Sequence, residues 1–214
     1  MQAGYLRVAS GFLNHISEGI HLSIAYYIQL STFTKTDTVI NRKGELIVFQ
    51  FDKISTKDKK SFYKELNGYL ESMLDGEPDW LAGISNASSL LYLMLEDINW
   101  AGFYLYKEEE LVLASFQGKP ACVRIAMGKG VCGTAAQTRE IQIVEDVNKF
   151  PGHIACDIAS QSEIVLPIIK EDRLIGVLDI DSPIKARFDK EDAEGLKEFV
   201  TILNKYLKWP DDFI

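Results

Sequence analysis

Strand-like runs enclosed between helical patterns constrain the fold of this chain more than any other feature of its sequence. Six short runs are apolar or aromatic and are bounded by polar or glycine-containing turns: 100–106, 111–116, 123–126, 141–144, 163–169 and 174–180. Apolar residues recur at helical spacing before and after these runs, in 55–73, 79–95 and 189–206. Strands grouped together between helices predict an α+β domain. We expect one antiparallel sheet of about six strands, with the N- and C-terminal helices packed on one face.

The helical segments carry recognisable start signals and buried faces. Ser55 and Thr56 provide hydroxyls that can cap the first helix. In the second helix one face is predicted to be buried, and it comprises Leu81, Ile84, Ala87, Ser88 and Leu91. A glycine-dense turn at 128–134 is predicted to open a short helix over 135–139.

The first 47 residues differ from the rest and divide the chain into an N-terminal extension, 1–47, and a domain, 48–214. Residues 31–42 lack any period and suggest a loop or linker. One hypothesis is that the segment is upstream sequence joined to the gene by a misplaced start. Codons for 43–45 can form a purine run like a bacterial ribosome-binding site, and Val48 can be an alternative start codon. The alternative is an N-terminal helix that packs on the domain or on a partner.

Composition and charge narrow the classes of partner. The formal net charge is −8 and the basic residues are scattered, which argues against a nucleic acid or an anionic membrane surface as the main partner. The moderately apolar stretch 11–33 is interrupted by polar residues, so it does not predict a membrane span. It also lacks the pattern of a secretory signal.

The three cysteines, Cys122, Cys132 and Cys156, are the first candidates for chemistry. Their spacing is not the paired Cys-x-x-Cys of zinc ribbons and thioredoxin motifs. Catalytic or redox-active thiols and small buried side chains are both consistent with the count. Cys156 lies in the aperiodic segment 145–161, where His153 can lower its pKa or simply pack in the loop. A zinc site built from the three cysteines and His153 requires separate loops to converge.

Three carboxylates and two aromatic residues form a second candidate group. Asp179 and Asp181 are two residues apart on a strand and therefore point to the same face, while Glu163 begins another strand. Acidic side chains gathered on one face favour a bound cation or a shared proton, although Asp181 can instead cap the turn at 182–183. Trp100 and Tyr104 also share a strand face and can wall a pocket or fill the core.

Taken in order, several segments resemble the free methionine-R-sulfoxide reductase family. The segments are 100–104 (WAGFY), 116–122 (FQGKPAC), 128–136 (GKGVCGTAA), 146–157 (DVNKFPGHIACD), 162–167 (SEIVLP) and 176–182 (GVLDIDS). The resemblance covers about residues 50–206 and leaves 1–47 without a counterpart. It implies a GAF fold and thiol-dependent reduction of free L-methionine-R-sulfoxide in the cytoplasm, with no metal or organic cofactor.

The resemblance also implies roles for individual residues. Cys156 is the implied attacking thiolate, Cys122 its resolving partner in an intramolecular disulfide, and Cys132 an auxiliary thiol. Glu163 is implied to hydrogen-bond the sulfoxide oxygen, assisted by Asp179 and Asp181, and Trp100 and Tyr104 to enclose the methyl-sulfoxide end. Thioredoxin is the implied reductant. Because GAF domains often dimerise through helices such as 57–72 and 189–206, a homodimer is a further expectation.

Two other classes of protein remain as alternatives at this point. One is a GAF module that binds a small ligand without turnover, and the other is a thiol redox sensor. A sensor requires only cysteines, whereas a sulfoxide reductase also requires an acid beside them.

Overall fold

The computed structural model describes residues 37–40, 46–49, 52–56, 58–152 and 157–211. The chain divides into two compact units, Met1–Asp52 and Lys53–Ile214. In the first unit, β1 (Asp37–Ile40) and β2 (Leu46–Phe49) pair antiparallel. The predicted loop over 31–42 is therefore wrong for 37–40, where local polarity is overridden by pairing between strands. The boundary expected between residues 47 and 48 lies inside β2.

The second unit contains the predicted antiparallel sheet. Its strands are β3 (Trp100–Lys107), β4 (Glu110–Gly118), β5 (Arg124–Ala126), β6 (Gln142–Val144), β7 (Ser162–Lys170) and β8 (Arg173–Ser182). Their order is β5-β4-β3-β8-β7-β6, and every neighbouring pair is antiparallel. The central strands β3 and β8 come from opposite ends of the strand region, so the sheet joins residues distant in sequence.

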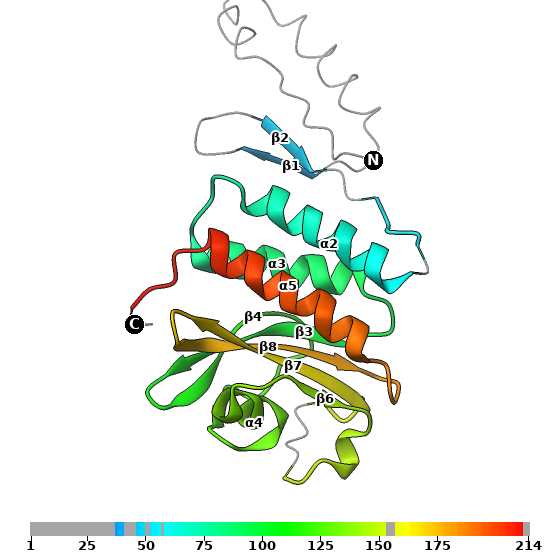
Figure 1. Cartoon of the computed structure of the whole chain (residues 1–214), viewed down its shortest axis with the longest axis vertical. Coiled ribbons are helices and arrows are strands. Elements are labelled where there is room, and N and C mark those ends of the chain that lie inside the picture. The colour runs from blue at the N-terminus through cyan, green and yellow to red at the C-terminus, as the bar shows by residue number, and fades with distance from the viewer. Residues whose placement is uncertain (1–36, 41–45, 50–51, 57, 153–156, 212–214) are drawn as a thin grey trace, which may run out of the picture. The chain divides into compact units, whose positions relative to one another are not determined.

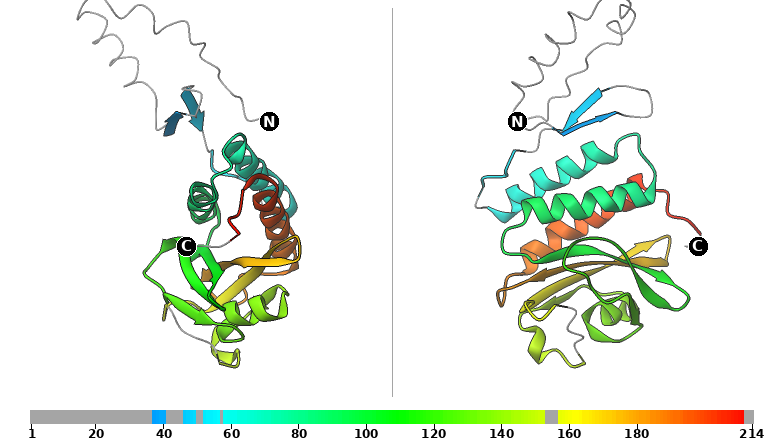
Figure 2. Two further views of the ribbon diagram at one scale, coloured as in Figure 1. Left: turned by 90° about the vertical axis from the view of Figure 1, so that its left-hand side faces the viewer. Right: turned by 180° about the vertical axis from the view of Figure 1, so that it is seen from behind.

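Helices cover both faces of this sheet. On one side lie α2 (Lys59–Leu74), α3 (Trp80–Met94) and α5 (Lys190–Tyr206), with α3 packed on β3 and β4 and α5 packed on β7 (Figures 1 and 2). The short helix α4 (Gly130–Thr138) packs on the other side, against β5 to β8. A 3-10 turn, η2 (Val147–Lys149), follows β6. No helix in the described part of the chain is long and apolar enough to cross a bilayer.

The helix boundaries agree with the expected ones except in α2 and α4. The cap of α2 is the Asp58 carboxylate, which accepts a hydrogen bond from the backbone N–H of Ser61 at 2.9 Å, rather than a hydroxyl of Ser55 or Thr56. Helix α4 begins at Gly130 instead of residue 135. A Cβ on Gly133 would lie 2.4 Å from the Ala126 carbonyl oxygen, so glycine is required where the helix crosses β5 closely.

One residue of the predicted buried face of α3 is exposed. Leu81 is 52% exposed, whereas the other four predicted residues are buried. Helical spacing identifies the side of a helix that is apolar, but it does not show where along its length the helix leaves its packing partners.

A buried ionic cluster fixes α2 against the start of α5. The Asp192 carboxylate, which is buried, accepts hydrogen bonds from Lys59 Nζ at 2.6 Å, Tyr63 Oη at 2.9 Å and Arg187 at 3.4 Å. It also accepts from the backbone N–H of Asp189 at 2.9 Å and so completes the capping box of α5. Three donors and a backbone N–H compensate this buried charge.

Replacing Tyr63 by Phe is expected to lower the free energy of unfolding by about 1.5–3 kcal/mol, the range for a hydrogen bond to a charged group. The variant removes only the donor to Asp192. Tyr69→Phe is the matched control on the same helix, because its hydroxyl bonds an exposed Glu65. Urea unfolding measures both. Equal effects of the two substitutions would contradict the role given to the buried cluster.

Candidate active site

The sheet register brings the predicted polar residues to the face that α4 covers. Trp100 lies opposite Asp181 across β3 and β8, and Glu163 lies opposite Asp181 across β7 and β8. Asp179 and Tyr104 follow at two- and four-residue intervals on their strands, so all five side chains project to one side. The same-face prediction for each pair is confirmed by the pairing.

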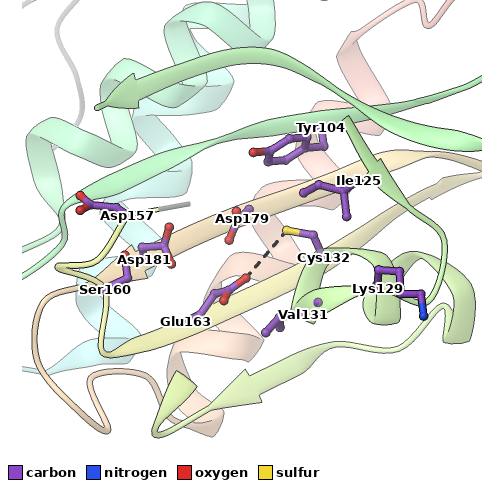
Figure 3. Close-up of a pocket in the computed structure, with 11 residues that line it drawn as sticks. Tyr104, Ile125, Lys129, Val131, Cys132, Asp157, Ser160, Glu163, Asp179 and Asp181 are labelled. Carbon is purple, nitrogen blue, oxygen red and sulfur yellow. Dashed lines mark hydrogen bonds between the residues drawn. The ribbon is translucent and has the colours of Figure 1, made fainter. Parts of the chain in front are cut away.

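A small cavity lies on this face of the sheet (Figure 3). It is lined by five strand and loop segments and by the first turn of α4. The empty space between its lining residues, including the open mouth, is about 390 Å³. The lining residues are Tyr104, Ile125, Lys129, Gly130, Val131, Cys132, Asp157, Ser160, Glu163, Asp179 and Asp181. The cavity therefore combines one thiol, one phenol and four carboxylates.

A thiol and two carboxyl groups lie close together in the cavity. Cys132 Sγ lies 3.8 Å from Glu163 Oε1, and one ligand atom each of Cys132, Glu163 and Asp179 lie within 4.8 Å of one another. All three side chains are buried. Asp179 Oδ1 has no hydrogen-bond partner, which is costly for a buried oxygen and indicates a position at which a ligand would donate or coordinate.

Burial in the cavity raises the pKa of these carboxyl groups. Burial, followed by the charges of Asp179 and Asp181, raises the pKa of Glu163 well above its ordinary value. Burial raises the pKa of Asp179 to about 6, and burial with the Asp179 charge raises the pKa of Asp181. A carboxylic acid that stays protonated near neutral pH can act as a general acid.

The same environment keeps Cys132 as a thiol. Burial, and then the negative charges of Asp179 and Glu163, raise the pKa of Cys132 well above its ordinary value. The one basic side chain among the described lining residues is Lys129, which is exposed and whose amine points away from the carboxylates in Figure 3. Cys132 therefore lacks the positive surroundings that activate a cysteine nucleophile.

The two predicted aromatic residues have different positions. Tyr104 lines the cavity, whereas Trp100 lies behind it, stacked on Tyr104 with ring centroids 5.9 Å apart and on Phe116 at 5.4 Å. The Trp100 indole donates to the Lys119 carbonyl oxygen at 3.1 Å. Trp100 thus supports the wall of the cavity and is not among the described lining residues.

Gly102 makes room for this aromatic stack. A Cβ at this position would lie 2.4 Å from Phe116 Cβ, 2.7 Å from the Trp100 ring and 2.8 Å from Phe116 Cα. We expect Gly102→Ala to lower the unfolding free energy by about 1–3 kcal/mol, the usual range for overpacking, and to reduce ligand affinity by displacing Tyr104. Gly68→Ala, at an exposed position of α2, is the control, because nothing lies within 4 Å of its new Cβ and alanine favours helix. Thermal unfolding of both variants checks this, and an unchanged Gly102→Ala would contradict it.

The other two predicted cysteines are not on the described lining. Cys122 is half-buried, packs against the apolar cluster that includes Trp100, Tyr104 and Cys132, and is disulfide-bonded, whereas Cys132 is free. Cys156 and His153 lie outside the described residues, and with them the hypothetical zinc site that uses His153.

Several lining residues were not predicted from the sequence. Ile125, Lys129, Gly130, Val131, Asp157 and Ser160 complete the cavity. Asn99 links two of them, because its Nδ2 donates to Asp157 at 3.2 Å and to Ser160 at 3.1 Å, and Lys119 pairs with Asp157 at 3.2 Å. The sequence signals near these residues were the predicted strand 123–126, the glycine-dense turn around Cys132 and the family-like segment 146–157, none of which identified a lining side chain.

Comparison with known proteins identifies close relatives. A GAF domain model matches residues 87–204. The free methionine-R-sulfoxide reductase of Escherichia coli strain K12 is 53% identical over 154 residues, covering 72% of this chain and 93% of that protein. The solved structure of fRMsr of Staphylococcus aureus in its reduced form is 49% identical, with a TM-score of 0.68, and covers 74% of this chain and 100% of that chain. The structure of free methionine-R-sulfoxide reductase from Neisseria meningitidis in complex with its substrate is 42% identical, with a TM-score of 0.71 and coverage of 74% and 95%.

Proposed function

The chain belongs to the free methionine-R-sulfoxide reductase family, with its GAF fold, and from this premise we propose that it reduces free L-methionine-R-sulfoxide to methionine. The observation that carries the proposal is the small cavity in which Glu163, a carboxyl group with a strongly raised pKa, lies beside the carboxyl group of Asp179. A sulfoxide oxygen needs a proton as it leaves sulfur, and an ammonium group needs a carboxylate partner. The cavity offers both.

Glu163 is the proposed acid in this cavity. Its carboxyl group is buried at the thiol end, and its raised pKa keeps the proton available at neutral pH. We assign Asp179 and Asp181 to the activation of the oxygen or to the substrate ammonium group. Tyr104, supported by the Trp100 stack, is assigned to the methyl-sulfoxide end.

Cys156 is the proposed nucleophile, and the state of Cys132 supports this choice. Cys132 is held as a neutral thiol by burial and by neighbouring carboxylates, so it is a poor nucleophile. The Cys156 thiolate attacks the sulfoxide sulfur while Glu163 protonates the oxygen. The protonated oxygen then passes from the substrate sulfur to the Cys156 sulfur, so that both the S–O bond and the new S–S bond to the substrate break. Methionine leaves with the electron pair on its sulfur, and Cys156 remains as a sulfenic acid.

Recycling requires a second thiol and an external dithiol. The Cys122 thiol condenses with the sulfenic acid, so that a disulfide forms and water leaves. That Cys122 is disulfide-bonded in this structure supports its assignment as the resolving cysteine. Thioredoxin, the proposed reductant, then exchanges its own dithiol for the disulfide and restores both thiols. This cycle requires a reducing compartment, and we propose the cytoplasm.

Turnover of the two sulfoxide epimers tests the function. NADPH oxidation through thioredoxin and its reductase is expected with free methionine-R-sulfoxide and not with the S epimer. Cys156→Ser is expected to abolish turnover. Cys132→Ser keeps both the proposed nucleophile and the proposed resolving thiol and is therefore expected to retain turnover. If the folded, reduced protein turns over neither epimer, the reductase proposal is wrong and a ligand-binding or redox-sensing function is favoured instead.

The N-terminal extension, residues 1–47, is proposed to be dispensable for this chemistry. The matched GAF region begins at residue 87, and the E. coli relative is matched over 93% of its own length by 72% of this chain. A chain beginning at residue 48 is expected to keep its turnover and its urea midpoint. Loss of either would assign the extension a structural role.

A further inference from the structure

One group of side chains in the cavity has the composition of a metal site as well as that of an acid site. Cys132, Glu163 and Asp179 offer one sulfur and two carboxylate oxygens within 4.8 Å of one another. They come from α4, β7 and β8, so three packed elements hold them and no exposed loop is involved. Thiolate and carboxylate together favour zinc among the common divalent cations.

The distances are close to those that a tetrahedral ion needs. With Zn–S of about 2.3 Å and Zn–O of about 2.1 Å, ligand atoms around tetrahedral zinc lie about 3.6 Å apart. The Cys132 Sγ to Glu163 Oε1 distance of 3.8 Å already matches this separation. The remaining pairs are at most 4.8 Å apart and need a contraction of about 1 Å, which rotation of a carboxylate can supply.

Two further observations point to a cation at this position. Asp179 Oδ1 is buried without a hydrogen-bond partner although its side chain lines the cavity. The acidic side chains Glu163, Asp179 and Asp181 face one another, with the exposed Lys129 as the only basic side chain among the described lining residues (Figure 3). A buried carboxylate oxygen without a hydrogen-bond partner, beside further carboxyl groups, is an environment in which a cation is stabilised.

We propose that Cys132, Glu163 and Asp179 bind a zinc ion that competes with the substrate for the cavity. The three residues supply three ligands, and the open side of the cavity supplies the fourth position to water. Binding releases the Cys132 proton and any carboxyl proton, because metal ligands must be deprotonated. Competition with substrate rests on the proposed function, whereas metal binding does not.

In the oxidised protein, metal binding at Cys132 can be measured without a contribution from the other two thiols. With Cys122 and Cys156 joined in the proposed disulfide, Cys132 is the thiol that remains for a metal, so a metal–thiolate signal reports on Cys132 alone. We would titrate the oxidised full chain with Cd²⁺, whose bond to a thiolate absorbs in the ultraviolet, and then displace it with Zn²⁺. One equivalent of Cd²⁺ is expected to produce the absorbance together with proton release in weakly buffered solution.

Variants assign the ligands. Cys132→Ser is expected to remove the absorbance. Asp179→Asn is expected to weaken Zn²⁺ binding by about 10-fold or more, since loss of an outer-shell partner alone costs 10–100-fold. Asp172→Asn, at an exposed turn between β7 and β8, is the control and is expected to leave affinity unchanged. Oxidised wild-type protein with no absorbance change, or Cys132→Ser with wild-type Zn²⁺ affinity, would overturn the proposal.

Competition with substrate separates this inference from the reductase proposal. In the oxidised protein, which cannot turn over, free methionine-R-sulfoxide is expected to weaken Cd²⁺ binding, whereas the S epimer is not. Cadmium binding that neither epimer affects would overturn the competition. A protein that binds Cd²⁺ at Cys132 but never reduces sulfoxide would instead refute the reductase proposal and leave the metal site standing.

Discussion

Replacing Glu163 by Gln is expected to lower kcat/KM for free methionine-R-sulfoxide by about 10²–10⁴-fold, the usual contribution of a general acid. Glutamine keeps the size of the side chain and its hydrogen-bonding capacity but cannot release a proton at neutral pH. The loss falls on kcat, because the proton is needed when the S–O bond breaks. The variant is expected to keep the shape of the cavity.

The pH profile distinguishes an acid from a binding residue. Because the pKa of Glu163 is raised by burial and by Asp179 and Asp181, the wild-type enzyme holds the required proton at neutral pH. Its rate is expected to fall as pH rises through that pKa, where the carboxyl group loses the proton. The Gln variant loses this alkaline limb along with its activity.

Two controls complete this experiment. Glu171→Gln, in the exposed turn after β7, is expected to retain wild-type turnover. Hydrogen peroxide is expected to oxidise the thiols of Glu163→Gln as in wild type, since no sulfoxide is involved. Wild-type kcat in Glu163→Gln would remove Glu163 from the role of acid.

The sequence predicted which residues share a face of the sheet, but not which residues lie opposite one another on neighbouring strands. The two-residue spacing of Asp179 and Asp181 determines their common side of β8, because side chains alternate along a strand. Placing Glu163 opposite Asp181 requires the antiparallel register of β7 and β8. The tight turn between those strands makes the pairing predictable in outline, whereas the exact register follows from packing.

The position of Cys132 could not be predicted from the helical periodicity of the sequence. Glycine is a poor helix former, so the sequence placed Cys132 in a turn before a helix. The close approach of α4 to β5 instead requires Gly133 inside the helix, and this places Cys132 in the first helical turn beside Glu163. The thiol and the acid meet through tertiary packing across 31 positions of the chain. The order of motifs identified the family, but the neutral state of this thiol depends on the packing.

Ser160 and Asp157 were missed for a related reason. Their segment has no period, and their positions depend on side-chain hydrogen bonds from Asn99, 58 and 61 residues away. Such bonds leave no local pattern in the sequence.

Replacing Asp179 by Asn is expected to stabilise the fold above pH 6 while it impairs turnover. Burial raises the pKa of Asp179 from 3.8 to about 6, so the folded state binds this proton more tightly than the unfolded state does. The group therefore destabilises the protein as pH rises from about 4 through about 6, and the effect is complete above that range. A shift of this size corresponds to at most about 3 kcal/mol, at 1.36 kcal/mol per pKa unit.

Urea unfolding at pH 4 and pH 8 measures the effect. At pH 8 Asp179→Asn is expected to exceed wild type by about 1–3 kcal/mol, and at pH 4 the two are expected to agree closely, because the wild-type carboxyl group is then protonated. A variant less stable than wild type at pH 8 would mean that a partner compensates the Asp179 charge. The expected result instead makes Asp179 a group retained for chemistry at the expense of stability, as strained or repulsive active sites commonly are.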